Sequence, residues 1–184
     1  MKSRFLFAAK IEHTRKTLTR LFRVQYYTFE KTRIAVRFCA GIVLIFGAVA
    51  VPLPVWARVL LLLPGTWLAV STDFPAQVQA DKVVSARKGS LPVMSYEFFD
   101  DHVKISGEGA MNLSYKKFAR LIHDDAYCYL LISRESICMM EKPENSEEFM
   151  KFIQTRTGLT WQKEKSFLAM NLQDLKDIFA RPKQ

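Results

Sequence analysis

The feature that most constrains this chain is an apolar block at residues 34–72, in which Arg37 and Arg58 are the only charged side chains. A single helix through the block would be about 58 Å long at 1.5 Å per residue, whereas the hydrocarbon core of a bilayer is about 30 Å thick. In the middle stands Val51-Pro52-Leu53-Pro54. Each proline removes a helix donor and disfavours the helical conformation at the residue before it. We therefore predict two helices, at 34–51 and 55–72, joined by a tight turn.

Two alternatives explain the block without a membrane. A buried hairpin of a soluble protein should show polar positions at helical spacing, and this block shows almost none. A cleaved signal peptide has a shorter apolar core that begins nearer the amino terminus. Each predicted helix is about 27 Å long. A helix of this length can cross a bilayer if the bilayer thins locally or if the flanking side chains reach the interface. We therefore interpret the block as a transmembrane helical hairpin.

Five residues of the block are candidates for contacts with the membrane interface or between the helices. Arg37 and Arg58 each lie one turn inside a predicted helix, where a long side chain can reach the interface. Trp56 fits an interfacial aromatic belt. Gly65 and Ala69 form a pair of small residues at helical spacing, which allows close helix packing. The first helix carries further small residues, namely Ala40, Gly41, Gly47 and Ala48.

Positive charge is concentrated before the apolar block. Residues 1–33 hold nine basic and two acidic side chains, a net charge of +7, whereas residues 73–184 hold 16 of each sign. Basic residues beside a membrane segment mark its cytoplasmic side. We therefore expect both termini to be cytoplasmic. A nucleic-acid partner is disfavoured, because the folded part of the chain lacks a net positive charge.

Outside the block, residues 1–33 are predicted to form a strand followed by a basic helix on the cytoplasmic side. Apolar residues alternate from Phe5 to Ile11, as in a strand with one covered face. Residues 73–92 are polar and are interpreted as a linker that starts as a helix. The sequence leaves open whether the amino-terminal strand joins a sheet formed by the carboxyl-terminal part.

Residues 93–184 are predicted to form a small α+β domain. Six short apolar runs read as strands and are separated by tight turns, as at Asp100-Asp101 and Asp124-Asp125. Strands so close in sequence pair antiparallel. A helix should begin near Asn145 and end at Gly158, and another should begin at Asn171. The expected fold is an antiparallel β meander or barrel closed by a carboxyl-terminal helix, similar in size to a pleckstrin-homology domain. The predicted strands are 96–99, 103–106, 111–114, 118–122, 127–133 and 137–140.

This order of segments resembles the YcxB-like family of bacterial membrane proteins. The resemblance is sharpest in Tyr96-Glu-Phe-Phe-Asp-Asp-His-Val103, in Leu113-Ser-Tyr-Lys-Lys-Phe118, and in Tyr127-Cys-Tyr-Leu-Leu-Ile132 leading to Glu141-Lys142-Pro143. It implies a multi-pass protein of the bacterial plasma (inner) membrane whose soluble domain is similar to a pleckstrin-homology fold. The family offers no activity and no functional residue to transfer.

The sequence contains no motif that indicates catalysis. It has no phosphate-binding loop, dinucleotide glycine pattern, nucleophile elbow or HExxH. The histidines are too scattered for a metal motif, the paired aspartates are explained by turns, and the cysteines match no zinc or redox spacing. We therefore expect no enzymatic activity, no cofactor and no metal. The residues considered are His13, His102, His123, Cys39, Cys128 and Cys138.

The function that the sequence favours is a membrane-anchored, cytoplasm-facing binding or regulatory module of undefined ligand. Because residues 73–184 carry no net charge, a protein or peptide partner is preferred over an anionic lipid headgroup. The alternative is a structural subunit of a homo-oligomer or of a larger inner-membrane complex. A third class, a hydrolase with an unrecognised site, predicts that some serine or acidic substitution abolishes activity without unfolding the protein.

Overall fold

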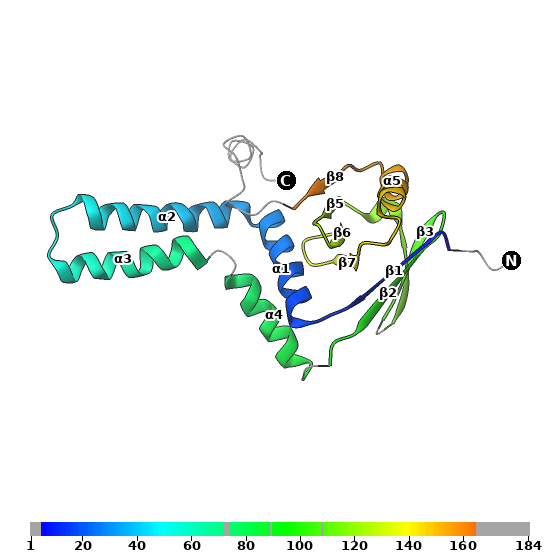
Figure 1. Ribbon diagram of the computed structural model, residues 1–184, viewed down its shortest axis with the longest axis horizontal. Helices are drawn as coiled ribbons and strands as arrows, with labels where there is room; N and C mark the ends of the chain where they lie inside the picture. The colour runs from blue at the N-terminus through cyan, green and yellow to red at the C-terminus, as the bar shows by residue number, and fades with distance from the viewer. Residues whose placement is uncertain (1–4, 72–73, 89, 108, 165–184) are drawn as a thin grey trace. The chain divides into compact units, whose positions relative to one another are not determined.

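A computed structural model describes residues 5–71, 74–88, 90–107 and 109–164 (Figure 1). The described residues form two units. The sheet unit contains the residues up to Phe22 together with Ala80–Glu164, and the helical unit contains Arg23–Gln79. The helix predicted to begin at Asn171 lies outside the described residues.

Four helices lie between the first and second strands of the chain. Helix α1 (Arg15–Phe29) begins after Thr14, whose Oγ1 accepts a hydrogen bond from the Thr17 amide at 3.2 Å and so caps the helix. Helices α2 and α3 lie side by side and antiparallel (Figure 1). The break between them occurs at the predicted prolines, where Val51 and Pro54 are extended. The remaining bounds are Lys31–Ala50 for α2, Val55–Val70 for α3 and Phe74–Ala86 for α4.

The helix lengths support one candidate membrane span. In the described part of the chain, α2 is the one helix that is both long and apolar enough to cross a bilayer by itself. Helix α3 has 16 residues and qualifies only if it is counted with α4 as a single bent span. The two predicted helices are therefore present, but their lengths do not establish two crossings.

The first sheet combines the amino-terminal strand with three strands from much later in the chain. Its order is β1-β2-β3-β4, and all neighbours are antiparallel. Strand β1 pairs with β2 from Phe7 opposite Phe98 to Glu12 opposite Val93. The sheet unit therefore draws on both ends of the described chain rather than on residues 93–184 alone. The strands are β1 (Phe7–Glu12), β2 (Val93–Phe98), β3 (His102–Ser106) and β4 (Ala110–Ser114).

The remaining strands form a second sheet. A 3-10 turn, Tyr115–Lys117, follows β4, and the chain then forms a sheet of order β7-β6-β5-β8. All six predicted strands occur within a few residues of their expected bounds, and the α+β class is confirmed. The meander does not close into a barrel, however, because this turn divides it into two sheets. The strands are β5 (Arg120–His123), β6 (Tyr127–Leu131), β7 (Ile137–Glu141) and β8 (Trp161–Lys163), of which β8 is parallel to β5.

Helix α5 (Ser146–Thr157) covers the core of the sheet unit (Figure 1). The fully buried ring of Phe149 lies 5.6 Å from the ring of Phe7 and 4.9 Å from that of Phe98. The helix thereby holds β1 and β2 together from one face. It ends as predicted at Gly158, which has φ 71°, a conformation that glycine adopts without a Cβ penalty.

Candidate functional site

The predicted helix-packing residues lie at the closest approach of α2 and α3. A Cβ atom placed on Gly41 would lie 2.8 Å from the Gly65 carbonyl oxygen and 2.9 Å from the Ala69 amide nitrogen. A Cβ atom on Gly65 would lie 3.1 Å from the Gly41 carbonyl oxygen. The two backbones therefore meet where none of the three residues carries more than a methyl group.

The small residues of α2 do not all face α3. Gly41 and Ala48 are buried, whereas Ala40 is exposed. A Cβ atom on Gly47 would have no neighbour within 4 Å. Helix α2 therefore has a second side with small residues, at Ala40 and Gly47, that α3 does not use.

The charged and aromatic candidates lie toward the ends of the hairpin. Arg37 donates a hydrogen bond from Nη2 to Ser71 Oγ at 2.9 Å, and Ser71 directly follows α3. This bond joins the two helices at the end opposite the proline turn. Trp56 and Arg58 lie in the first turn of α3, beside the proline turn, and both are exposed.

The outer apolar surface of the hairpin consists of large apolar side chains that no other described residue covers. Seven of them are at least 67% exposed, which is unusual for side chains of this kind in water. A hairpin buried in a soluble core would have these side chains covered, so the structure does not favour that reading of the apolar block. The seven residues are Val43, Phe46, Val49, Val55, Trp56, Leu63 and Val70.

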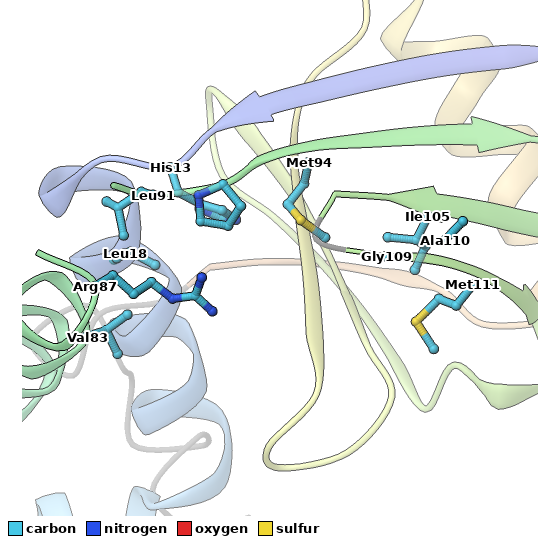
Figure 2. Close-up of a pocket in the computed structure, with 11 residues that line it drawn as sticks. His13, Leu18, Val83, Arg87, Leu91, Met94, Ile105, Gly109, Ala110 and Met111 are labelled. Carbon is cyan, nitrogen blue, oxygen red and sulfur yellow. The ribbon is translucent and has the colours of Figure 1, made fainter. Parts of the chain in front are cut away.

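The sheet unit contains a cavity of about 420 Å³, which we name the His13 cavity (Figure 2). Its residues come from three segments that are distant in sequence: the start of α1, the end of α4 with the residues after it, and strands β2 to β4. They are His13, Leu18, Val83, Arg87, Leu91, Pro92, Met94, Ile105, Gly109, Ala110 and Met111.

The His13 cavity is apolar except for two basic side chains. Among its lining residues only His13 and Arg87 are polar, and none is acidic. His13 Nδ1 is buried and has no hydrogen-bond partner among the described residues. Burial, together with the nearby positive charge of Arg87, lowers the pKa of His13 below its ordinary value. Figure 2 shows the Arg87 side chain extending from the helix side of the cavity toward the strand side.

An ion pair connects the two helices that border the cavity. Arg15 Nη2 donates to Asp81 Oδ2 at 2.8 Å, which joins the start of α1 to α4. The pair is exposed, so its contribution to stability is small. Asp81, the acidic residue of α4, does not line the cavity. Its carboxylate is paired with Arg15 instead.

The paired aspartates act in turns, as the sequence predicts. Asp124 Oδ1 accepts hydrogen bonds from the Ala126 and Tyr127 amides, each at 2.7 Å. Its Oδ2 accepts a hydrogen bond from the Tyr129 hydroxyl at 2.7 Å. Asp101 forms a 2.6 Å contact with Nδ1 of His102. The described residues contain no group of three or more histidine, cysteine or acidic side chains that could hold a metal ion.

Sequence reasoning did not single out the His13 cavity. It treated His13 as an isolated histidine and placed Arg87 in a linker. The two residues line one cavity because β1, which ends just before His13, pairs with β2, which begins shortly after Arg87. No spacing along the chain signals such a meeting.

Comparison with known proteins assigns no family. No family model matches this chain, and no curated protein matches it. Among solved structures, the chain is similar to one described as "Structure of the Spt16D Pob3N heterodimer", with 11% identity and a TM-score of 0.35. The match covers 45% of this chain and 52% of that chain, about half the length of each. A similarity of this degree supports no assignment of fold or function.

Proposed function

We propose that the protein is a membrane-anchored, cytoplasm-facing binding module without catalytic activity. In this proposal the α2–α3 hairpin is the anchor and the His13 cavity is the ligand site. The observation that carries it is the outer apolar surface, where seven large apolar side chains are at least 67% exposed. Contiguous apolar surface of this kind marks a membrane or protein interface.

The pairing of β1 with β2 supports an even number of membrane crossings. These two strands are hydrogen-bonded to each other, so both must lie on the same side of a membrane. Helix α2 lies between them in the chain, and a single crossing by α2 would separate them. A return crossing by α3 satisfies the sheet, although 16 residues span only about 24 Å. That length requires local thinning of the bilayer or contributions from the flanking residues.

Cysteine accessibility in intact bacterial cells tests the anchor and its topology. We expect Leu53→Cys in the proline turn to react with a membrane-impermeant maleimide from outside the cell. Glu135→Cys, an exposed position between β6 and β7, should react only after permeabilisation. Both variants are made with Cys39→Ser as background, and the protein should resist extraction by carbonate.

Two results would overturn this proposal. Release of the protein by carbonate would show that the hairpin is not a membrane anchor. Labelling of Leu53→Cys only after permeabilisation would show that the hairpin enters the membrane from the cytoplasm without crossing it.

The second candidate function is that of a structural subunit in an oligomer or larger membrane complex. The observation that favours it is the unused side of α2, where Gly47 faces open space and would let another helix approach closely. Cross-linking in native membranes separates the two functions. A subunit gives a fixed ladder of bands that Gly47→Leu abolishes, whereas a binding module gives no such ladder.

Two expectations from the sequence remain predictions. The resemblance to the YcxB-like family is one of them. The other is a protein or peptide partner, for which β4 offers a place, because it is the last strand of the first sheet and an extended peptide can add to such an edge.

A further inference from the structure

The size and walls of the His13 cavity suit a small apolar ligand. Its volume of about 420 Å³ falls within the range of about 300 to 1,000 Å³ that is typical of small-molecule sites. The walls are formed by aliphatic and thioether side chains from both helices and all three strands. The apolar lining side chains that favour an acyl chain as the occupant are Leu18, Val83, Met94, Ile105 and Met111.

One part of the cavity suits an anion. Arg87 contributes a guanidinium, which can donate two parallel hydrogen bonds to a carboxylate or a phosphate. His13 contributes its imidazole ring to the cavity wall, with Nδ1 buried beneath the surface. Because no lining residue is acidic, Arg87 would repel a ligand with a cationic head and no carboxylate of the lining would offset this repulsion.

We propose that the His13 cavity binds a single-chain amphiphile with an anionic head. The acyl chain lies against Met94, Ile105 and Met111, and the head lies between Arg87 and His13. A carboxylate and a phosphate share this chemistry, and the experiment below distinguishes them. This inference rests on the proposed function, because it names the ligand class of the binding module.

Histidine NMR on the full chain in phosphatidylcholine nanodiscs tests the proposal. The chain has three histidines, so the spectrum of histidine-labelled protein is simple, and His13→Gln assigns the signal of interest. Decanoate and decyl phosphate are titrated in parallel. We expect a saturable shift of the His13 signal with at least one of them, while the signals of His102 and His123 stay in place. The anion that gives the saturable shift, decanoate or decyl phosphate, identifies the head group.

A pair of charge variants separates specific binding from a general charge effect. Arg87→Gln should weaken binding about fivefold, which corresponds to about 1 kcal/mol. Lys82→Gln removes the same charge from α4 at an exposed position that does not line the cavity, and it should bind like the wild type. Both positions are exposed, so neither substitution should affect folding, which thermal unfolding checks.

Competition with matched amphiphiles provides the second comparison. 1-Decanol has the same chain length without a charge, and decyltrimethylammonium carries the opposite charge, so neither should displace the bound anion. The proposal is overturned if neither anion gives a saturable shift, if Arg87→Gln and Lys82→Gln behave alike, or if 1-decanol competes equally well. These outcomes leave the membrane anchor untouched, whereas failure of the cysteine accessibility test removes the anchor without changing the binding data.

Discussion

At the scale of single residues, the two cysteines of the second sheet are buried and inert. Cys128 and Cys138 are free thiols that lie two positions apart across the β6–β7 pair, because Cys128 is opposite Met140 and Cys138 is opposite Leu130. Burial raises the pKa of each thiol from 9.0 to about 12. At neutral pH both residues are therefore uncharged and poorly nucleophilic.

We predict that these thiols resist modification in the folded protein. In a Cys39→Ser background, a water-soluble maleimide at pH 7.5 should react with neither thiol until guanidinium unfolds the sheet unit. Because the folded pKa lies above the unfolded one, the stability from burying the neutral thiols is complete below pH 9. It is lost as the pH rises toward 12. Rapid labelling of the native protein would show that β6 and β7 are accessible.

The hydroxyl of Tyr129 offers a second test at this scale. It donates a 2.7 Å hydrogen bond to Asp124, and burial, reinforced by this bond, raises the pKa of Tyr129. Tyr129→Phe should lower the free energy of unfolding by about 1 kcal/mol, measured by urea denaturation. Tyr127→Phe is the matched control, because it keeps the aromatic ring that stacks with Arg20. Equal losses in the two variants would show that the Tyr129 bond contributes nothing.

At the scale of elements, the contact between α2 and α3 depends more on Gly41 than on Gly47, the next glycine of α2. Gly41→Ala places a methyl group 2.8 Å from the Gly65 carbonyl oxygen, whereas Gly47→Ala meets nothing within 4 Å. The first substitution should destabilise the hairpin by about 1 to 3 kcal/mol, as overpacking does. The second should be neutral or slightly stabilising, since alanine favours a helix over glycine.

Loss of helical circular dichroism on titration with SDS measures this difference. Gly41→Ala should lose its helical signal at a lower SDS concentration than Gly47→Ala and the wild type. A midpoint for Gly41→Ala at or above that of Gly47→Ala would show that the backbones of α2 and α3 can separate without cost.

At the scale of the whole molecule, the helices occupy an insertion within the sheet. Strands β1 and β2 are neighbours in the sheet and yet enclose all four helices α1 to α4. Ile11 of β1 is 1% exposed and Phe7 packs on the ring of Phe149. Strand β1 therefore supplies part of the core as well as hydrogen bonds.

A chain reduced to residues 93–184 should consequently fail to fold cooperatively. It lacks β1, so the edge of β2 that pairs with β1 loses its hydrogen-bond partners and the core loses Ile11. We expect no sharp unfolding transition in the near-ultraviolet circular dichroism of this fragment. In the full chain, Ile11→Ala should lower the free energy of unfolding by about 2 to 5 kcal/mol. A fragment that unfolds like the full chain would show that β1 is dispensable.

Much of the secondary structure could be predicted from the sequence because its signals are local. Two prolines interrupt an apolar helix wherever they occur, and residues that alternate between apolar and polar form a strand with one covered face. The helices at 34–51 and 55–72, the six strands and the helix end at Gly158 all rest on such signals. Strand β8 was missed because it has three residues and its partner is distant in sequence.

The sequence by itself determined which segments are apolar, where helices and turns occur, and that the positive charge is concentrated before the apolar block. Each of these features depends on a residue and its near neighbours. Only the tertiary structure decided that β1 pairs with β2, that the meander divides into two sheets, and that His13 and Arg87 line one cavity. These features depend on contacts between segments far apart in the chain. Their free energy comes from the fit of two surfaces, which no local pattern contains.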